Sequence, residues 1–143
     1  MSLMPSEAAV RRAIARAQSV LPGRRAPDRQ TDPRWQAIIR IGTFIELHPE
    51  PVWEFARRWG KHAQSDLRAA VATCLLEHLL EHHFETLFPR VRREALASVR
   101  FADTVASCWP MGLAALPRNV ARMQRLKREL RRIHRRTERR RSF

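Results

Sequence analysis

The stretch SDLRAAVATCLLEHLLEHHF, residues 65–84, decides the fold of this chain. Its apolar residues recur three or four positions apart, which is the spacing of one face of an α-helix. They are Leu67, Ala70, Val71, Cys74, Leu75, Leu79 and Leu80. Leu76 and Phe84 widen this face. The pattern therefore predicts a long helix at the centre of the molecule, with its leucines facing the core.

Helical patterns lie on both sides of this stretch. They cover residues 5–20, 32–47, 50–59, 84–96 and 98–108. Ser6 and Asp32 are predicted N-caps, and Ser65 or Asp66 is predicted to cap the central helix. Pro89 predicts a bend in the segment that follows. No segment alternates between apolar and polar residues with period two, so we expect an all-α fold.

Positive charge is concentrated at the two ends of the chain. The formal net charge is +14 over 143 residues. Residues 1–31 hold six Arg against two acidic residues, residues 32–117 hold ten basic and ten acidic residues, and residues 118–143 hold twelve against two. We therefore divide the chain into a basic N-terminal helix with a Pro-rich linker (1–31), a neutral helical domain (32–117) and an Arg-rich C-terminal helix or tail (118–143).

The order of motifs in the neutral domain resembles HEAT repeats. PEPVWEFARRWG, residues 49–60, is followed by KHAQSDLRAAVATCLLEHLL, in which Asp66 precedes a Leu-Arg-x-Ala motif at a helix start. The arrangement is similar to the HEAT-like repeats of bacterial DNA alkylation repair proteins and covers about residues 32–109. The resemblance implies antiparallel helix pairs in a short right-handed stack. It also implies that Asp66 caps its helix and that Arg68 bonds a turn in the neighbouring repeat; a simple cap and a solvated arginine are the alternative.

The DNA alkylation repair proteins that this chain resembles are glycosylases with a catalytic Asp. Enzymatic activity is not expected here, because no residue of this chain matches that Asp. Cys74, His78 and His82 share one helical stripe and are candidate zinc ligands. The fourth ligand would be Cys108, His62, Glu85 or water. We favour a core cysteine with histidines at the edge of the apolar face, and therefore expect no metal and no cofactor. A Cys74–His78 dyad is disfavoured because burial suppresses the thiolate. His78 with Glu81 or Glu77 would instead form a buried polar pair.

The four tryptophans, Trp35, Trp53, Trp59 and Trp109, lie on apolar stripes. We interpret them as core or groove residues; the alternative is a surface on which nucleic-acid bases stack.

The C-terminal segment combines an apolar stripe with a strongly basic face. Val120, Met123, Leu126, Leu130 and Ile133 are spaced to dock on the domain. The candidate phosphate-binding residues are Arg118, Arg122, Arg125, Lys127, Arg128, Arg131, Arg132, Arg135, Arg136, Arg139, Arg140 and Arg141. Two alternatives are a short coiled-coil seam and adhesion to an anionic membrane. The membrane alternative ranks lower because the stripe lacks aromatic anchors.

These features together predict a non-enzymatic, cytoplasmic, nucleic-acid-associated protein. Its helical core would contact a protein partner, and its arginines would bind DNA or RNA backbones without reading sequence. No apolar run approaches the roughly 18 residues that span a bilayer. The second hypothesis is a protein-interaction adaptor, whose tail binds an acidic partner or forms a homodimer through Met123, Leu126, Leu130 and Ile133.

Overall fold

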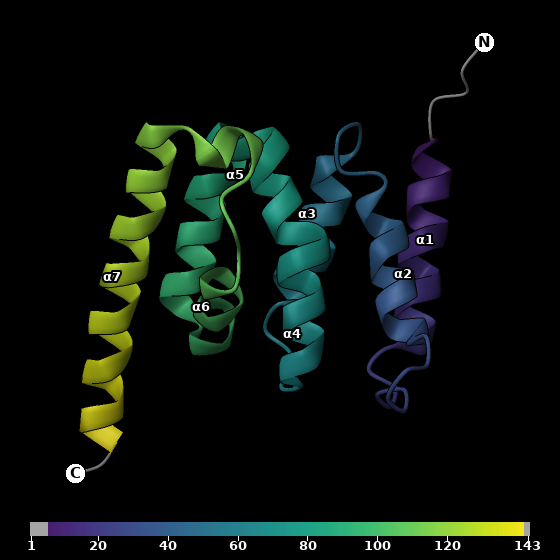
Figure 1. The fold of residues 1–143 in the computed structure, drawn as a ribbon, viewed down its shortest axis with the longest axis horizontal. Coiled ribbons are helices and arrows are strands. Elements are labelled where there is room, and N and C mark those ends of the chain that lie inside the picture. The colour runs from purple at the N-terminus through teal and green to yellow at the C-terminus, as the bar shows by residue number, and fades with distance from the viewer. Residues whose placement is uncertain (1–5, 142–143) are drawn as a thin grey trace.

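The chain folds into helices that lie side by side along the long axis of the molecule, with α1 at one end and α7 at the other (Figure 1). The computed structural model describes residues 6–141. Its helices are α1 (Glu7–Val20), α2 (Pro33–Gly42), α3 (Pro49–Trp59), α4 (Ser65–Val71), η1 (Ala72–Leu76), α5 (Glu77–Ala97), α6 (Val99–Ala106), η2 (Gly112–Ala115) and α7 (Pro117–Arg141). The described part of the chain contains no strand, so the all-α prediction is confirmed.

The central stretch forms a helical rod, residues 65–82, made of α4, η1 and the first turns of α5 in direct succession. The middle piece, η1, is a π-helical turn. The rod ends at His83, whose φ of −135° and ψ of 41° are not helical. The rest of α5 runs back alongside the rod, so that Glu94 pairs at 3.0 Å with Lys61, which lies just before the rod begins (Figure 1). The prediction of a bend at Pro89 is therefore wrong, because Pro89 lies inside the helix that resumes after the break. The His83 ring anchors the break through Nε2, 2.9 Å from the carbonyl oxygen of Ile45.

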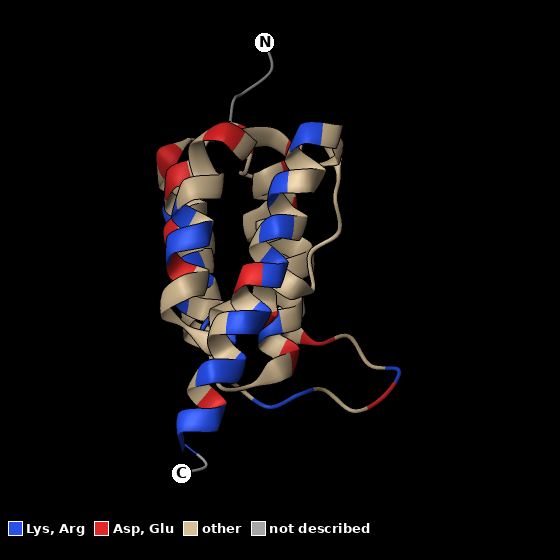
Figure 2. Cartoon of the chain, turned by 90° about the vertical axis from the view of Figure 1, so that its left-hand side faces the viewer, with Lys and Arg blue, Asp and Glu red and all other residues tan. Residues whose placement is uncertain are grey.

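A single apolar core connects all the layers. It takes Val10 from α1, Ile38 from α2, Leu75 from the rod, Phe101 from α6 and Leu126 from α7, all of them buried. Viewed end-on, the helices stand in two columns, and the core fills the space between them (Figure 2). Both terminal helices therefore contribute side chains to the same core as the neutral domain.

The helix caps follow the sequence at two of the three predicted places. The Ser6 hydroxyl accepts a hydrogen bond from the backbone N–H of Ala9, and Asp32 accepts one from Arg34. The predicted cap of the central helix is wrong. The N-cap residue is Gln64, which makes no side-chain capping bond. The Asp66 carboxylate forms an ion pair with another residue instead.

That partner is Arg34, which is buried at the junction of α2 and α4 with only 2 % of its surface exposed. All five of its guanidinium N–H donors have acceptors. Nε and one Nη bond Asp32 at 3.1 and 2.8 Å, and the same Nη also binds Asp66. The other Nη donates to the Pro22 carbonyl at 3.3 Å and to Gln64 at 3.1 Å. The adjacent Arg34 lowers the pKa of Asp32 to about 2. We call these five residues the Arg34 cluster.

Arg68 also differs from what the HEAT resemblance implies. Its guanidinium donates to the carbonyls of His62 and Ala63 at 2.9 and 3.0 Å, in the turn that precedes its own helix. It also pairs with Asp103 of α6 at 3.0 Å. Arg68 therefore joins its own turn to the neighbouring α6 helix.

Candidate nucleic-acid interface

The α7 helix is attached to the domain by its apolar stripe. Met123, Leu126 and Leu130 are 8, 2 and 4 % exposed, and they belong to the common core. Val120 and Ile133 are half-buried on the same side. The helix packs on α5, α6 and η2. The predicted docking of this stripe is confirmed, and its basic residues are therefore carried on a fixed helix.

Some of the predicted phosphate-binding residues are used to fix the start of α7. Arg118 and Arg122 both pair with Glu85 of α5, at 3.0 and 3.1 Å. The Arg122 guanidinium also lies 4.7 Å from the centre of the Phe88 ring, a cation–π distance. Lys127 donates to the Cys108 carbonyl at 3.4 Å. Arg118, Arg122 and Lys127 therefore contact the rest of the domain, although each of them is also partly exposed to solvent.

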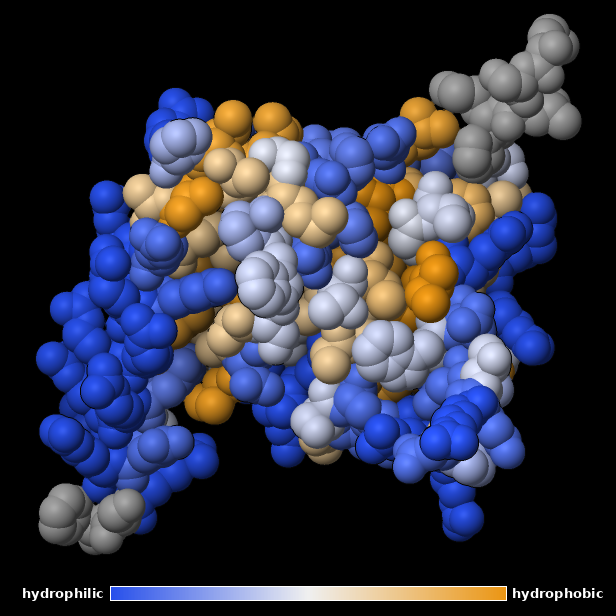
Figure 3. Space-filling model, viewed as in Figure 1, coloured by the Kyte–Doolittle hydropathy of each residue, from blue (hydrophilic) through white to orange (hydrophobic). Residues whose placement is uncertain are grey.

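The remaining arginines form an exposed surface that we call the α7 basic face. Its members are Arg125, Arg128, Arg131, Arg132, Arg135, Arg136, Arg139, Arg140 and Arg141, all exposed. Figure 2 shows basic residues at successive turns of this helix, and Figure 3 shows that the side of the molecule formed by α7 is strongly hydrophilic. Within residues 6–141, Arg125, Arg128 and Arg132 make no ion pair, which leaves their guanidinium donors to solvent or to a ligand.

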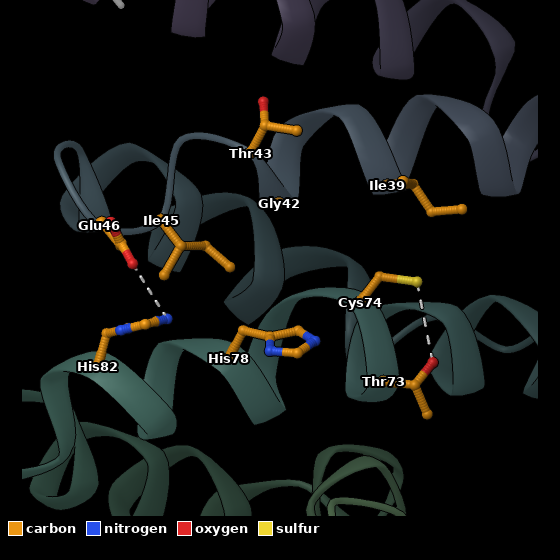
Figure 4. A pocket seen from close by; sticks show the side chains of 9 residues that line it. All are labelled: Ile39, Gly42, Thr43, Ile45, Glu46, Thr73, Cys74, His78 and His82. Atoms are coloured by element: carbon orange, nitrogen blue, oxygen red, sulfur yellow. Dashed lines mark hydrogen bonds and ion pairs between the residues drawn. The ribbon is translucent and has the colours of Figure 1, made fainter. Parts of the chain in front are cut away.

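The candidate metal residues line a separate open cavity of about 430 Å³ between α2 and the central rod (Figure 4). There the Cys74 Sγ is directed to Thr73, 3.8 Å away, and His82 is directed to Glu46. His78 Nδ1 lies 2.8 Å from Glu81, so the predicted His78–Glu81 pair is confirmed, although it is only half-buried. In the described chain no group of three His, Cys, Asp or Glu side chains is placed to hold a metal ion.

Both cysteines are in environments that disfavour the thiolate. Burial raises the pKa of Cys74, and it raises the pKa of Cys108 to about 12. A neutral thiol is a poor nucleophile and a poor metal ligand. This chemistry argues against the Cys74–His78 dyad.

The tryptophans occupy two different environments. Trp53 is buried, and Trp35 and Trp59 pack against the core, as the apolar interpretation predicts. Trp109 is 73 % exposed, so it is not a core residue; it lines a small depression beside α7 instead. It lies past the end of α6, next to Pro110, where the helical period of the sequence has stopped. The break in the period was the available signal that Trp109 need not face the core.

Comparison of the chain with protein families, curated proteins and solved structures finds no match. The fold and the surface together define the class: an all-helical protein with one strongly basic helix at its edge. The HEAT-like resemblance stays a prediction. Among residues 6–141, no helix is both long enough and apolar enough to cross a bilayer.

Proposed function

We propose that this protein is a non-enzymatic nucleic-acid-binding protein that contacts the phosphate backbone through the α7 basic face. The observation that carries the proposal is the exposed arginine surface on a helix whose opposite side is buried in the core. Guanidinium groups bind phosphate oxygens in pairs and are weakly hydrated, so they suit this ligand better than ammonium groups do.

The spacing of the arginines supports contact with several phosphates. Residues three or four positions apart on a helix have side chains about 5–6 Å apart on one face. Arg128, Arg131 and Arg135 follow this spacing. Phosphate contacts position a nucleic acid without reading its bases, so binding would be independent of sequence.

The helical body would serve as a rigid frame in this proposal. We further propose that its helices form antiparallel, HEAT-like pairs in a right-handed stack, as the motif order in residues 49–80 suggests. The side-by-side arrangement of α1 to α7 is compatible with such a stack (Figure 1). The surfaces of the frame away from α7 would then be available to a protein partner in the cytoplasm.

Fluorescence anisotropy with labelled DNA and RNA tests the proposal. The variant Arg128→Gln, Arg131→Gln, Arg132→Gln and Arg135→Gln removes four charges and keeps good helix formers. We expect a loss of affinity of about a hundredfold at 100 mM salt, and a shallower dependence of affinity on salt concentration. If the unchanged protein does not bind nucleic acid at this salt concentration, the proposal is contradicted. It is also contradicted if the four substitutions leave the affinity unchanged.

The matched control removes the same charge from the other end of the molecule. Arg12, Arg16, Arg24 and Arg25 are exposed, and α1 lies at the end opposite to α7. Their replacement by glutamine should reduce affinity much less. Deletion of residues 118–143 is a poorer test, because it also removes Met123, Leu126 and Leu130 from the core.

The second candidate is a protein-interaction adaptor in which the same arginines bind an acidic protein. Its homodimer form is less favoured, because the seam of Met123, Leu126 and Leu130 is covered by the protein's own core. Sedimentation over a wide concentration range tests the homodimer, and a constant monomer mass would exclude it. Tight, salt-dependent binding to nucleic acid would favour the first candidate over an acidic protein partner.

A further inference from the structure

We propose that Trp109 is a stacking platform for an unpaired base, so that the preferred ligand of the α7 basic face is single-stranded nucleic acid. This inference rests on the proposed function, to which it adds the class of ligand. It starts from an unusual combination at residue 109: the side chain is 73 % exposed, whereas the chain around it is firmly held.

Hydrogen bonds fix the segment between α6 and α7 on both sides of Trp109. The buried Cys108 thiol bonds the carbonyl oxygens of Ala72 and Thr104 at 3.7 and 3.6 Å. The backbone N–H of Trp109 faces the carboxylate of the buried Glu77. Further along, the Asn119 side chain donates to the Leu113 carbonyl at 2.9 Å. The exposure of the indole is therefore a property of a fixed loop.

Gly112 holds the same loop close to the central rod. Its φ is +51°, and a Cβ at this position would lie 2.6 Å from the Cγ of Glu81. Only glycine accommodates both the backbone conformation and the close approach. An aromatic side chain on such a loop loses little conformational entropy when a ligand binds, which favours affinity.

The exposed indole lies next to the basic helix. Trp109 and Lys127 line the same small, mostly apolar depression of about 120 Å³, together with Pro110, Val120, Met123 and Gln124. Lys127 reaches across to the Cys108 carbonyl, one residue before Trp109. An apolar ring face and a cation thus meet at one place, as the base and the phosphate of one nucleotide require.

The basic face leads away from this place along α7. Arg128 lies four residues after Gln124, and Arg131 lies four residues after Lys127, so both continue the side of the helix that lines the depression. Arg135 follows one turn later. From Lys127 to Arg135 the helix rises about 12 Å. A strand whose base is stacked on Trp109 can therefore place its neighbouring phosphates along these arginines.

The charge decides between the possible occupants of this surface. An apolar depression alone would also suit a hydrophobic peptide, but a row of exposed arginines complements a regular row of negative charges, which is what a nucleic-acid strand supplies. In a duplex the base faces are already stacked on each other. The exposed indole therefore distinguishes a single strand from a duplex.

The test measures affinity for a labelled twelve-residue oligothymidylate and for a duplex of the same length. Trp109→Ala should weaken binding to the single strand by about tenfold, the effect of losing one stacked base, and leave duplex binding unchanged. Trp109→Phe, which keeps a ring, should retain most of the affinity. It should also abolish the quenching of tryptophan emission that single-strand binding produces in the unchanged protein.

Leu116→Ala is the control, since Leu116 is an exposed apolar residue of the same loop segment and should have little effect. Equal losses for single strand and duplex in Trp109→Ala, or an equal loss in Leu116→Ala, would overturn the stacking inference and leave phosphate binding in place. A Trp109-dependent affinity for an acidic peptide above that for the oligonucleotide would overturn it in favour of a protein ligand. No binding to either nucleic acid by the unchanged protein would overturn the proposed function, and the inference with it.

Discussion

The Arg34 cluster and the α7 basic face use the same side chain for opposite purposes. At Arg34, five N–H donors meet two carboxylates, an amide and a carbonyl of the same chain, so nothing is left for a ligand. On α7, Arg125, Arg128 and Arg132 have no ion-pair partner among residues 6–141. The difference teaches that the role of an arginine depends on whether its acceptors lie within the fold. One region should control stability, and the other should control binding.

The largest effect should come from removing the buried arginine. Arg34→Met leaves two carboxylates facing each other without their cation, and should lower the free energy of unfolding by about 3 kcal/mol. Urea denaturation measures this loss. Arg128→Met on the exposed face is the matched control and should change stability by less than about 0.5 kcal/mol. Similar losses in the two variants would remove the distinction between the regions.

The next effect is a loss of stability in acid that depends on Asp32. Because Arg34 lowers the pKa of Asp32 from 3.8 to about 2 in the folded state, the unfolded state binds the proton more tightly. The resulting stabilisation, about 2 kcal/mol, is present above pH 3.8 and is lost as the pH falls through about 2. Urea denaturation at pH 5, 4, 3 and 2 measures it. In Asp32→Asn this component of the pH dependence should disappear; an unchanged acid profile would contradict the assignment.

A smaller effect is expected where the chain turns toward the Arg34 cluster. Gly23 has a φ of +48°, and a Cβ there would lie 2.6 Å from the Val20 carbonyl oxygen and 3.3 Å from the Arg34 side chain. Gly23→Ala should therefore cost about 1–2 kcal/mol of stability, measured by thermal and urea unfolding. Nucleic-acid affinity should not change. A stable Gly23→Ala protein would show that the turn can relax without disturbing Arg34.

The smallest effect should come from releasing two arginines of α7 that are paired within the fold. Glu85 lies on the surface and binds Arg118 and Arg122, which lower its pKa. Glu85→Gln removes the competing carboxylate, so these two arginines become available for phosphate. Affinity for nucleic acid should rise by about threefold, and the salt dependence should steepen. Glu46→Gln, a change of an exposed carboxylate near His82, is the control; an equal rise there would indicate only a change in net charge.

The helical parts of the fold follow from local patterns in the sequence, and the long-range contacts do not. The apolar spacing of Met123, Leu126 and Leu130 was sufficient to predict the buried side of α7, because periodicity within one helix is a local property. The partners of Arg34 come from residues 22, 32, 64 and 66, and no local rule brings them together. For the same reason Asp66 was assigned to a cap.

The candidate site shows the same division. The basic character of α7 could be read from composition, but the use of Arg118 and Arg122 against Glu85 depends on how α5 and α7 meet. The exposure of Trp109 depends on the hydrogen bonds that hold the neighbouring Cys108 to Ala72 and Thr104. An apolar residue type did not predict this exposure, because the path of the loop decides which side chains reach the core.

The π-helical turn η1 has a consequence for the tolerance of the chain to insertion and deletion. The rod buries Leu67 and Val71 before this turn, Leu76 at its end and Leu80 after it. The steps from Leu67 to Val71 and from Leu76 to Leu80 are four residues, but the step from Val71 to Leu76 is five, and the wider turn accommodates the additional residue. Deleting one residue from Ala72–Leu76 would rotate the preceding side chains by about 100° relative to those that follow. This turn therefore sets the rotational phase between the two halves of the rod. A change of length there would disturb the packing of both halves.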